Sequence, residues 1–348
     1  MRSRILITSA VALVLVLGGL VAARLLQGPG TVLAEAVALA PADTQRYTFT
    51  DWAAVRQEVA GDPGPTGNLA ELLSAGFEAD LTSASGLVES AALLEAEFGW
   101  SLDTVEWELL AQSPGGAVEI VSLGDVDPGA VTDRLTALGY QAPAEPDGIW
   151  VGGTDLLATL SGRAGLVATP NLQYVAVDAE AGLLRASDRQ PFLESALEDP
   201  PDPDEGIDQV VSAVSESPAA AVVYTADQAC ASLAMGQADE SDQATADELQ
   251  ARAGELNPVT GFTMAVLPGG SVEVLLGFES DDQARTNADT RAVLAAGPAP
   301  GQGGDFTDRF TVEEVAAEGS LVRLSLDPVE GAYVLSDLSS GPVLFASC

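Results

Sequence analysis

The sequence predicts an α+β fold, in which helices cover one face of a mainly antiparallel sheet, and two observations support this class. A hairpin-like stretch occurs twice, as PGGAVEIV at residues 114–121 and as PGGSVEVL at residues 268–275. Each copy reads as a tight turn that enters an apolar strand and is followed by a capped helix. Strands in hairpins with helices interspersed favour α+β over an alternating α/β fold. We therefore predict two tandem repeats behind an N-terminal membrane segment.

The expected organisation of the chain has five parts. Residues 1–27 are a membrane anchor or signal segment, 28–41 a spacer, 42–197 the first repeat, 198–217 an acidic proline-rich linker with a helix, and 218–348 the second repeat. A length of 348 residues agrees with about two domains, and 47% hydrophobic residues is ordinary for a chain that buries a core.

The N-terminal segment has the length of a membrane span. Arg2 and Arg4 precede residues 5–23, which carry no charge. A hydrocarbon core needs about 20 helical residues, whereas the apolar part of a signal peptide has about 7–15. The two arginines place the N-terminus inside. Residues 21–23 and 32–34 also fit a small-residue cleavage pattern, so a cleaved secretory signal stays open; either way the rest of the chain lies outside the cytoplasm.

In the first repeat, local patterns predict the elements in turn. We expect a strand at 47–50, a helix capped by Asp51, and helices at 68–80 and 85–98. Residues 105–109 alternate apolar with acidic and predict a strand with one solvent-facing side, which the turn at 114–116 joins to its partner. A helix follows from Asp127 to a stop at Gly139. Further strands are expected at 149–151, 156–160, 173–177 and 183–186, and a helix after Asp188.

The second repeat has a similar order. A strand is expected at 222–226 with a helix directly after it, and a longer helix at 242–256. Strands at 259–267 and 271–278 form the second hairpin, and a helix follows Ser280. Strands at 310–315, 321–326, 332–335 and 343–346 are expected to complete the sheet.

Aspartates recur at matching positions of the two repeats. The pairs are Asp51 with Asp227, Asp127 with Asp281, and Asp188 with Asp337. Each precedes a helical stretch, so helix capping explains the recurrence without a ligand. The alternative is a carboxylate pair for acid–base catalysis, as in glycoside hydrolysis.

Composition excludes several chemistries. The chain has 52 acidic and 14 basic residues, a formal charge of −38, no His, and no Lys. Histidine relays, His-ligated zinc, Schiff-base lysines and phosphate-loop lysines are therefore excluded. So acidic a protein also repels nucleic acid, and no catalytic residue or bound cofactor is assigned.

The two cysteines, Cys230 and Cys348, both lie in the second repeat. Outside the cytoplasm such a pair is expected to form a disulfide, which would tie the C-terminus to the first helix of that repeat. Free thiols or a bond to another chain are the alternative.

Two groups of residues allow a binding role beside a structural one. All four tryptophans belong to the first repeat, namely Trp52, Trp100, Trp107 and Trp150. They are expected in the core, or alternatively on a surface that binds a glycan or peptide.

Asp202, Asp204 and Asp208 alternate around Gly206 in the manner of a calcium loop. Calcium needs six to eight oxygens, whereas here the glycine falls one place early and Ala213 stands where an acid is required. A weak calcium site and a solvated acidic linker both remain open.

The N-terminal anchor, the stretch APADT at 40–44 leading to TDWA at 50–53, and the later Ser187-Asp188 resemble uncharacterised membrane-anchored or secreted proteins of high-GC Gram-positive bacteria. The resemblance implies a setting and no activity. We expect an extracytoplasmic cell-envelope protein with a non-enzymatic binding or scaffolding role toward an envelope protein or glycan. The alternatives are a carboxylate-dependent hydrolase acting on envelope glycans and a weak calcium-binding surface protein.

Overall fold

The computed structural model describes residues 30–163, 166–198 and 204–348. The expected membrane segment lies outside these residues. Within them, no helix combines the length and apolar character that crossing a membrane requires.

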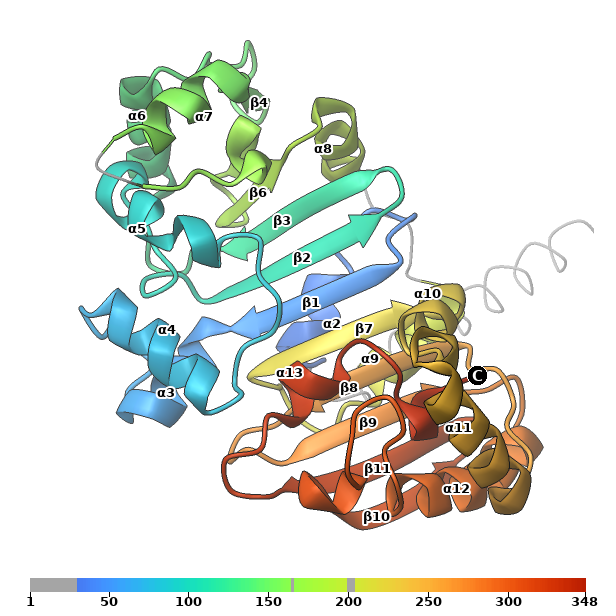
Figure 1. Cartoon of the computed structure of the whole chain (residues 1–348). Coiled ribbons are helices and arrows are strands. Elements are labelled where there is room, and N and C mark those ends of the chain that lie inside the picture. Colours follow the sequence, from blue (N-terminus) through green and yellow to red (C-terminus); the bar gives the residue numbers. More distant parts are fainter. Residues whose placement is uncertain (1–29, 164–165, 199–203) are drawn as a thin grey trace, which may run out of the picture.

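The described chain is built on one antiparallel sheet of eleven strands (Figure 1). Their order is β10-β11-β9-β8-β7-β1-β2-β3-β6-β5-β4, and every neighbouring pair is antiparallel. The strands are β1 Arg46–Asp51, β2 Trp107–Ser113, β3 Gly116–Ser122, β4 Ile149–Val151, β5 Tyr174–Asp178, β6 Leu183–Ser187, β7 Ala220–Thr225, β8 Gly261–Val266, β9 Val272–Gly277, β10 Phe310–Glu318 and β11 Leu321–Pro328. The predicted α+β class is confirmed.

Strands β1 and β7 lie at the centre and join the two predicted regions into one sheet. Their register runs from Arg46 opposite Tyr224 to Thr50 opposite Ala220. Outward from this pair the order is β1-β2-β3-β6-β5-β4 on one side and β7-β8-β9-β11-β10 on the other. We call these two sides the first and second halves, and the line between β1 and β7 the seam.

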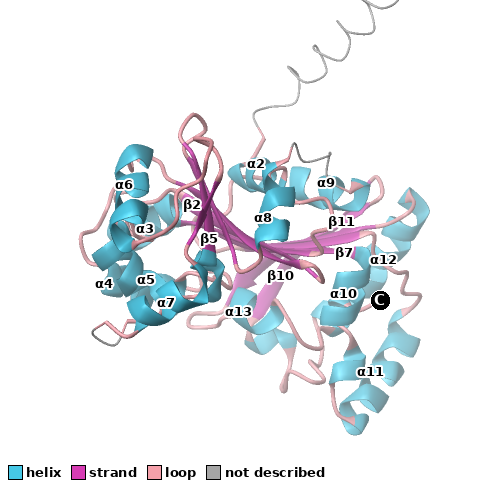
Figure 2. Cartoon of the chain, turned by 90° about the horizontal axis from the view of Figure 1, so that it is seen from above, coloured by secondary structure: helices cyan, strands magenta, loops and turns pink. Residues whose placement is uncertain are grey.

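Helices cover both faces of the sheet, so the expectation of helices on one face was wrong. One face, here the helix-rich face, packs against α3 Trp52–Ala60, α4 Leu69–Glu78, α5 Ala91–Leu93, α6 Pro128–Leu138, α7 Gly153–Ser161, α10 Ala226–Ser232, α11 Glu240–Ala253, α12 Asp281–Ala295 and α13 Val334–Leu338. The opposite, three-helix face packs against α2 Val32–Val37, α8 Gln190–Leu197 and α9 Glu205–Ser212 (Figure 2). The cause is that the central strands carry buried side chains on both sides.

The helix ends predicted from capping residues are confirmed for α3 and α6. Asp51 caps α3 by accepting a hydrogen bond from the Ala54 N–H at 2.8 Å, and Asp127 caps α6 through the Gly129 N–H at 2.9 Å. Gly139 ends α6 in the left-handed region, with φ of 102°. These are interactions between residues a few positions apart, which is why the sequence shows them.

The capping explanation fails for the other recurring aspartates. Arg189, not Asp188, stands at the N-cap of α8, and Asp337 lies inside α13. Asp227 and Asp281 lie in the first turns of α10 and α12, one or two residues after the N-cap. There a carboxylate still favours the helix dipole, but it is not the cap.

Three short apolar runs expected as strands are helical. Residues 156–160 belong to α7, residues 334 and 335 begin α13, and Leu344–Ala346 form a 3-10 turn. A run of four or five apolar residues does not distinguish a strand from a buried helix. The expected helix at 85–98 is also broken, into a 3-10 turn, α5 and a π turn at Leu94–Phe98.

Two segments differ from the role their composition suggested. Part of the expected spacer forms α2, whose Leu33 and Ala36 are fully buried and whose Val32 N–H donates to Ser217 at 3.2 Å. Of the two acids on the solvent-facing side expected at 105–109, Glu106 is exposed, but the prediction was wrong for Glu108, which is only 2% exposed. The helix expected within 198–217 is α9, whereas residues 199–203 of the linker lie outside the described ranges.

The predicted disulfide is confirmed. Cys230 of α10 bonds to Cys348, with the Cα atoms 5.4 Å apart. The C-terminus is therefore fixed to the first helix of the second half.

Candidate functional site

A cavity of about 320 Å³ lies on the helix-rich face, over the two central strands. Its floor contains Thr48 of β1 and Val222 of β7, which are directly paired across the seam. The remaining lining comes from both halves and consists of Arg46, Phe77, Thr82, Ser83 and Ala84 from the first, and Leu335, Ser336, Ser339 and Ser340 from the second. We call this cavity the seam pocket.

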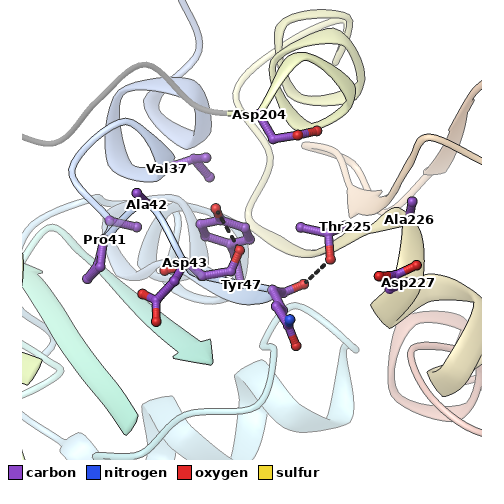
Figure 3. A pocket seen from close by; sticks show the side chains of 12 residues that line it. Val37, Pro41, Ala42, Asp43, Tyr47, Asp204, Thr225, Ala226 and Asp227 are labelled. Carbon is purple, nitrogen blue, oxygen red and sulfur yellow. Dashed lines mark hydrogen bonds between the residues drawn. The ribbon is translucent and has the colours of Figure 1, made fainter. Parts of the chain in front are cut away.

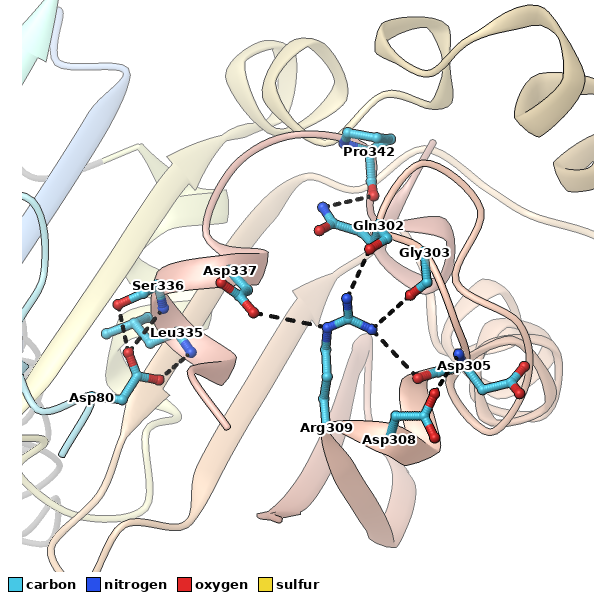
Figure 4. A network of polar contacts seen from close by, with 10 residues as sticks. All are labelled: Asp80, Gln302, Gly303, Asp305, Asp308, Arg309, Leu335, Ser336, Asp337 and Pro342. Carbon is cyan, nitrogen blue, oxygen red and sulfur yellow. Dashed lines mark hydrogen bonds and ion pairs between the residues drawn. The ribbon is translucent and has the colours of Figure 1, made fainter. Parts of the chain in front are cut away.

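A buried carboxylate holds the two walls of the seam pocket together. Asp80, which follows α4 in the left-handed region with φ of 55°, accepts hydrogen bonds from the Leu335 and Ser336 N–H groups at 2.7 and 3.1 Å (Figure 4). The Ser336 hydroxyl adds a third bond at 2.6 Å. Burial raises the pKa of Asp80, and the bonds from Ser336 and Leu335 oppose that rise. A first-half residue thus caps a second-half helix.

Helix α13 is also anchored from its far side. Arg309 lies 3.9 Å from Asp337 and donates to the Gln302 carbonyl at 2.8 Å (Figure 4). The second-half wall of the pocket is therefore tied both to α4's end and to the loop before β10.

Two polar groups in the seam pocket have no partner among the described residues. The Arg46 guanidinium lies over the Tyr224 ring, 5.6 Å from its centroid, and its buried Nε makes no hydrogen bond. No carboxylate in the described ranges lies within 4 Å of Arg46. Thr48 is 2% exposed, and its Oγ1 also lacks a partner. Buried polar groups are normally satisfied, so this arrangement points to an additional acceptor.

Tyr224 fixes the position of Arg46. Its hydroxyl donates to the Ser339 carbonyl, and its ring is fully buried and stacked on Phe262. Burial raises the pKa of Tyr224, while the charge of Arg46 opposes the rise. The aromatic support of the guanidinium is therefore rigid and neutral.

A second hollow, of about 350 Å³, lies beside Tyr47 (Figure 3). Its charged lining residues are Asp43, Asp204 and Asp227. Burial raises the pKa of Tyr47 to about 12; the Thr44 side chain opposes this rise, and the charges of Asp204 and Asp43 add to it. This hollow is acidic, and across the described ranges no group of three or more Asp, Glu, Cys or His residues is arranged to hold a metal ion.

The calcium hypothesis concerns this neighbourhood and stays a prediction. Asp202 lies outside the described residues. Asp204 caps α9 by accepting from the Gly206 N–H at 2.9 Å, and Asp208 accepts from the Ser212 hydroxyl at 3.1 Å. Both described carboxylates thus already have protein partners.

A pair of buried acids lies further along the helix-rich face. Glu108 of β2 and Glu119 of β3 are diagonal neighbours, 2% and 0% exposed. Asn171 donates to Glu119 Oε1 at 3.3 Å, while both carboxylate oxygens of Glu108 and Oε2 of Glu119 have no hydrogen-bond partner among the described residues. A Cβ at Gly86 would lie 1.9 Å from Glu119 Oε1, so the backbone there approaches as only glycine allows.

Burial controls the protonation of this acid pair. It raises the pKa of Glu108 to about 7, and it raises that of Glu119 well above the ordinary range, where the charge of Glu108 adds to the effect. The Ser85 hydroxyl and the Trp52 indole oppose the rise at Glu108, although neither makes a hydrogen bond of ordinary geometry with it. The pair can hold a proton, but its side chains do not reach solvent where a substrate would meet them.

All four tryptophans are buried. Their exposed fractions range from 0% to 9%, with Trp52, Trp100 and Trp150 in the core of the helix-rich face and Trp107 in that of the three-helix face. They are core residues in this structure, which is the first of the two interpretations that the sequence left open.

Sequence reasoning missed Arg46, Thr48, Glu108 and Glu119. A usable signal was present in β1, whose sequence RYTFTD places Arg46, Thr48 and Thr50 on one side and aromatic residues on the other. In a chain without Lys or His, an arginine on the polar side of a central strand is a candidate ligand-binding group.

Comparison of the chain with protein-family models, with curated proteins and with solved structures gives no match. The fold and the seam pocket therefore define the class: an α+β protein with a continuous antiparallel sheet and a polar cavity where its two halves meet.

Proposed function

We propose that this chain is an extracytoplasmic protein of the cell envelope that binds a small ligand in the seam pocket, without catalysing a reaction on it. One observation carries the proposal: both halves build the pocket, and its floor presents the unpartnered Thr48 hydroxyl beside Arg46. Ligand pockets lie preferentially between structural units and have volumes of about 300–1,000 Å³. A cavity of about 320 Å³ suits a small molecule.

Two features support the extracytoplasmic setting. The disulfide is of a kind that persists in oxidising compartments. The uncharged stretch at 5–23 has the length of a membrane span. Of the two cleavage patterns, the one at 32–34 falls in α2, where Leu33 is fully buried. The proposal therefore includes a retained anchor, or cleavage near Ala23.

The proposal also includes an ancestral tandem duplication. The strand order is the same outward from the seam on both sides, except that β4 has no counterpart. Strands β6 and β11 occupy matching places and read LLRAS and LVRLS. A duplication would explain why the proposed ligand site lies at the seam, where the halves meet.

Native mass spectrometry of the full-length chain, extracted from its own membranes, tests the binding role. Ala84 is an exposed residue at the pocket, so Ala84→Trp should fill the cavity without disturbing the core. Val329→Trp adds the same side chain at a 43% exposed position elsewhere. We expect a small-molecule adduct on the wild type and on the Val329 variant that Ala84→Trp removes.

Two results would contradict the proposal. An adduct that survives Ala84→Trp would place the ligand elsewhere. Recovery of the wild type with a stoichiometric protein partner and no small molecule would favour scaffolding instead.

A further inference from the structure

Resting on the proposed function, we infer that the ligand of the seam pocket is a small organic acid, whose carboxylate pairs with Arg46 and whose body lies against the apolar part of the lining. Arg46 is the charged residue among those that line the cavity. The apolar part consists of Phe77, Ala84, Val222 and Leu335.

The first step of the argument is the state of Arg46. Its guanidinium has no carboxylate within 4 Å in the described part of the chain. Arginine presents a planar fork that donates two parallel hydrogen bonds to a carboxylate, and stacking on an aromatic ring fixes the plane of that fork. The buried Tyr224 ring provides this support at 5.6 Å. The pocket therefore holds an oriented cation without a counter-ion from the described residues.

The second step is the arrangement of the remaining donors. Thr48 follows Arg46 by two positions on β1, so both side chains leave the same side of the strand, roughly 7 Å apart at the backbone. Thr48 Oγ1 is buried and unpartnered. A ligand oxygen between the two would satisfy both groups, which a purely apolar ligand would not.

The third step is the absence of competition from Asp80, the carboxylate bonded to the pocket wall. Its oxygens accept three hydrogen bonds, from the backbone of Leu335 and Ser336 and from the Ser336 hydroxyl. The formal charge of −38 repels anions at long range, but salt screens such fields within about 8 Å at physiological ionic strength. Selection of an acid therefore depends on the contact with Arg46.

Calorimetric titration of the full-length chain in mild detergent tests the inference with three probes of one size: hexanoate, hexanamide and hexylamine. We expect hexanoate to bind at least roughly tenfold more tightly than hexanamide, because a charge-assisted bidentate pair is lost in the amide. Hexylamine should not bind. Titration into detergent alone gives the blank.

Three variants locate the effect. Arg46→Gln should weaken hexanoate binding roughly tenfold or more, and Thr48→Val a few-fold. Arg46→Lys keeps the charge and should retain part of the affinity, which also shows that the site remains folded. Arg252→Gln removes the same charge from an exposed side chain and should change nothing.

The outcomes separate this inference from the proposed function. Equal binding of hexanoate and hexanamide, both abolished by Ala84→Trp, would overturn the acid class and leave the pocket as a binding site. If no probe binds while Ala84→Trp still removes a native adduct, the acid class is likewise overturned and the pocket remains a binding site. Failure of every probe together with the lack of any native adduct would overturn both.

Discussion

Both halves of the sheet carry a buried glutamate and an arginine at related positions, but the two residues form an ion pair only in the second half. In the second half, Glu273 and Arg323 lie on the three-helix face and form an ion pair, with Glu318 as a second partner of the arginine. In the first half, Glu119 of the matching motif lies on the helix-rich face, and no arginine of the described ranges lies within 4 Å of it. Arg185, the counterpart of Arg323, has a buried Nε that finds no hydrogen-bond partner in the part of the chain that the structure describes.

The cause is one residue in the hairpin loop. Ser113 pairs with Gly116, which leaves two residues in the first loop. In the second loop the Leu267 N–H donates to the Ser271 carbonyl, which leaves three residues between them. The longer loop contains Gly269 and Gly270 with φ of 85° and 88°. Successive side chains of a strand point to opposite faces, so one extra residue moves the motif's glutamate to the other side.

The comparison shows that a repeated motif need not repeat its chemistry. Glu273 gains Arg323 and the Ser215 N–H at 3.0 Å, while Glu119 gains one amide bond from Asn171. Burial lowers the pKa of Arg185, opposed by the charge of Asp178. The second half is therefore held by a paired network, and the first contains an acid pair that favours protonation.

The largest difference between the halves should come from the disulfide, since both cysteines lie in the second half. Replacing Cys230 and Cys348 by Ser opens a loop whose ends are 118 residues apart. The chain-entropy model predicts a loss of about 4–5 kcal/mol in the free energy of unfolding. Urea denaturation of the double variant against the oxidised wild type measures it. A loss below about 1 kcal/mol would mean that other contacts hold the C-terminus, Arg291 and its bond to the Phe345 carbonyl being the first to test.

Glu273→Gln should cost about 2 kcal/mol, because it removes the buried carboxylate that pairs with Arg323, whose side chain is 17% exposed and keeps Glu318 as a partner. Glu318→Gln is the matched control: it removes the other partner of Arg323, whose side chain is 51% exposed, and should cost less than about 1 kcal/mol. Denaturant unfolding of both variants gives the comparison. Equal losses in the free energy of unfolding would show that the buried partner of Arg323 stabilises the fold no more than the exposed one.

Glu108→Gln should remove part of the pH dependence of stability in the first half. The folded-state pKa of Glu108 is raised from 4.5 to about 7, so folding favours the protonated acid. Its stabilisation is complete below pH 4.5 and is lost as the pH rises through about 7, a change of about 3 kcal/mol in the wild type.

Unfolding measured at about pH 5 and about pH 8 tests this window. Asp51, Asp80 and Glu119, whose pKa values burial also raises, give the wild type a slope of the same sign, so the difference between variant and wild type is the relevant quantity. Glu106→Gln, which changes an exposed acid two residues away, should leave the slope unchanged. An unchanged slope in Glu108→Gln would mean that this carboxylate is already ionised in the folded state.

The sequence predicted what local rules control. The caps at Asp51 and Asp127, the stop at Gly139 and both hairpins depend on residues within one turn of each other, and the pairing of Cys230 with Cys348 followed from there being two cysteines. The solvent-facing side assigned to Glu108 failed because alternation along a strand does not show which helices cover it. The seam pocket brings Arg46 near Ser339 through the pairing of β1 with β7, which no local pattern indicates.

The smallest predicted effect tests whether loop length alone separates the halves. Val118 pairs with Ser187 as Glu273 pairs with Ser325, so Val118 holds the position that Glu273 has in the second half. Val118→Glu should place a carboxylate diagonal to Arg185 and form the missing ion pair. A double-mutant cycle with Arg185→Gln should give a coupling of about 1–2 kcal/mol in the free energy of unfolding.

Val118→Gln, which has the same shape without the charge, should couple to Arg185 by less than about 0.5 kcal/mol. Similar coupling for both would mean that packing, rather than charge, distinguishes the two faces; a large coupling for the acid alone would show that the first half retains the arginine's site and lacks only a glutamate on the correct side.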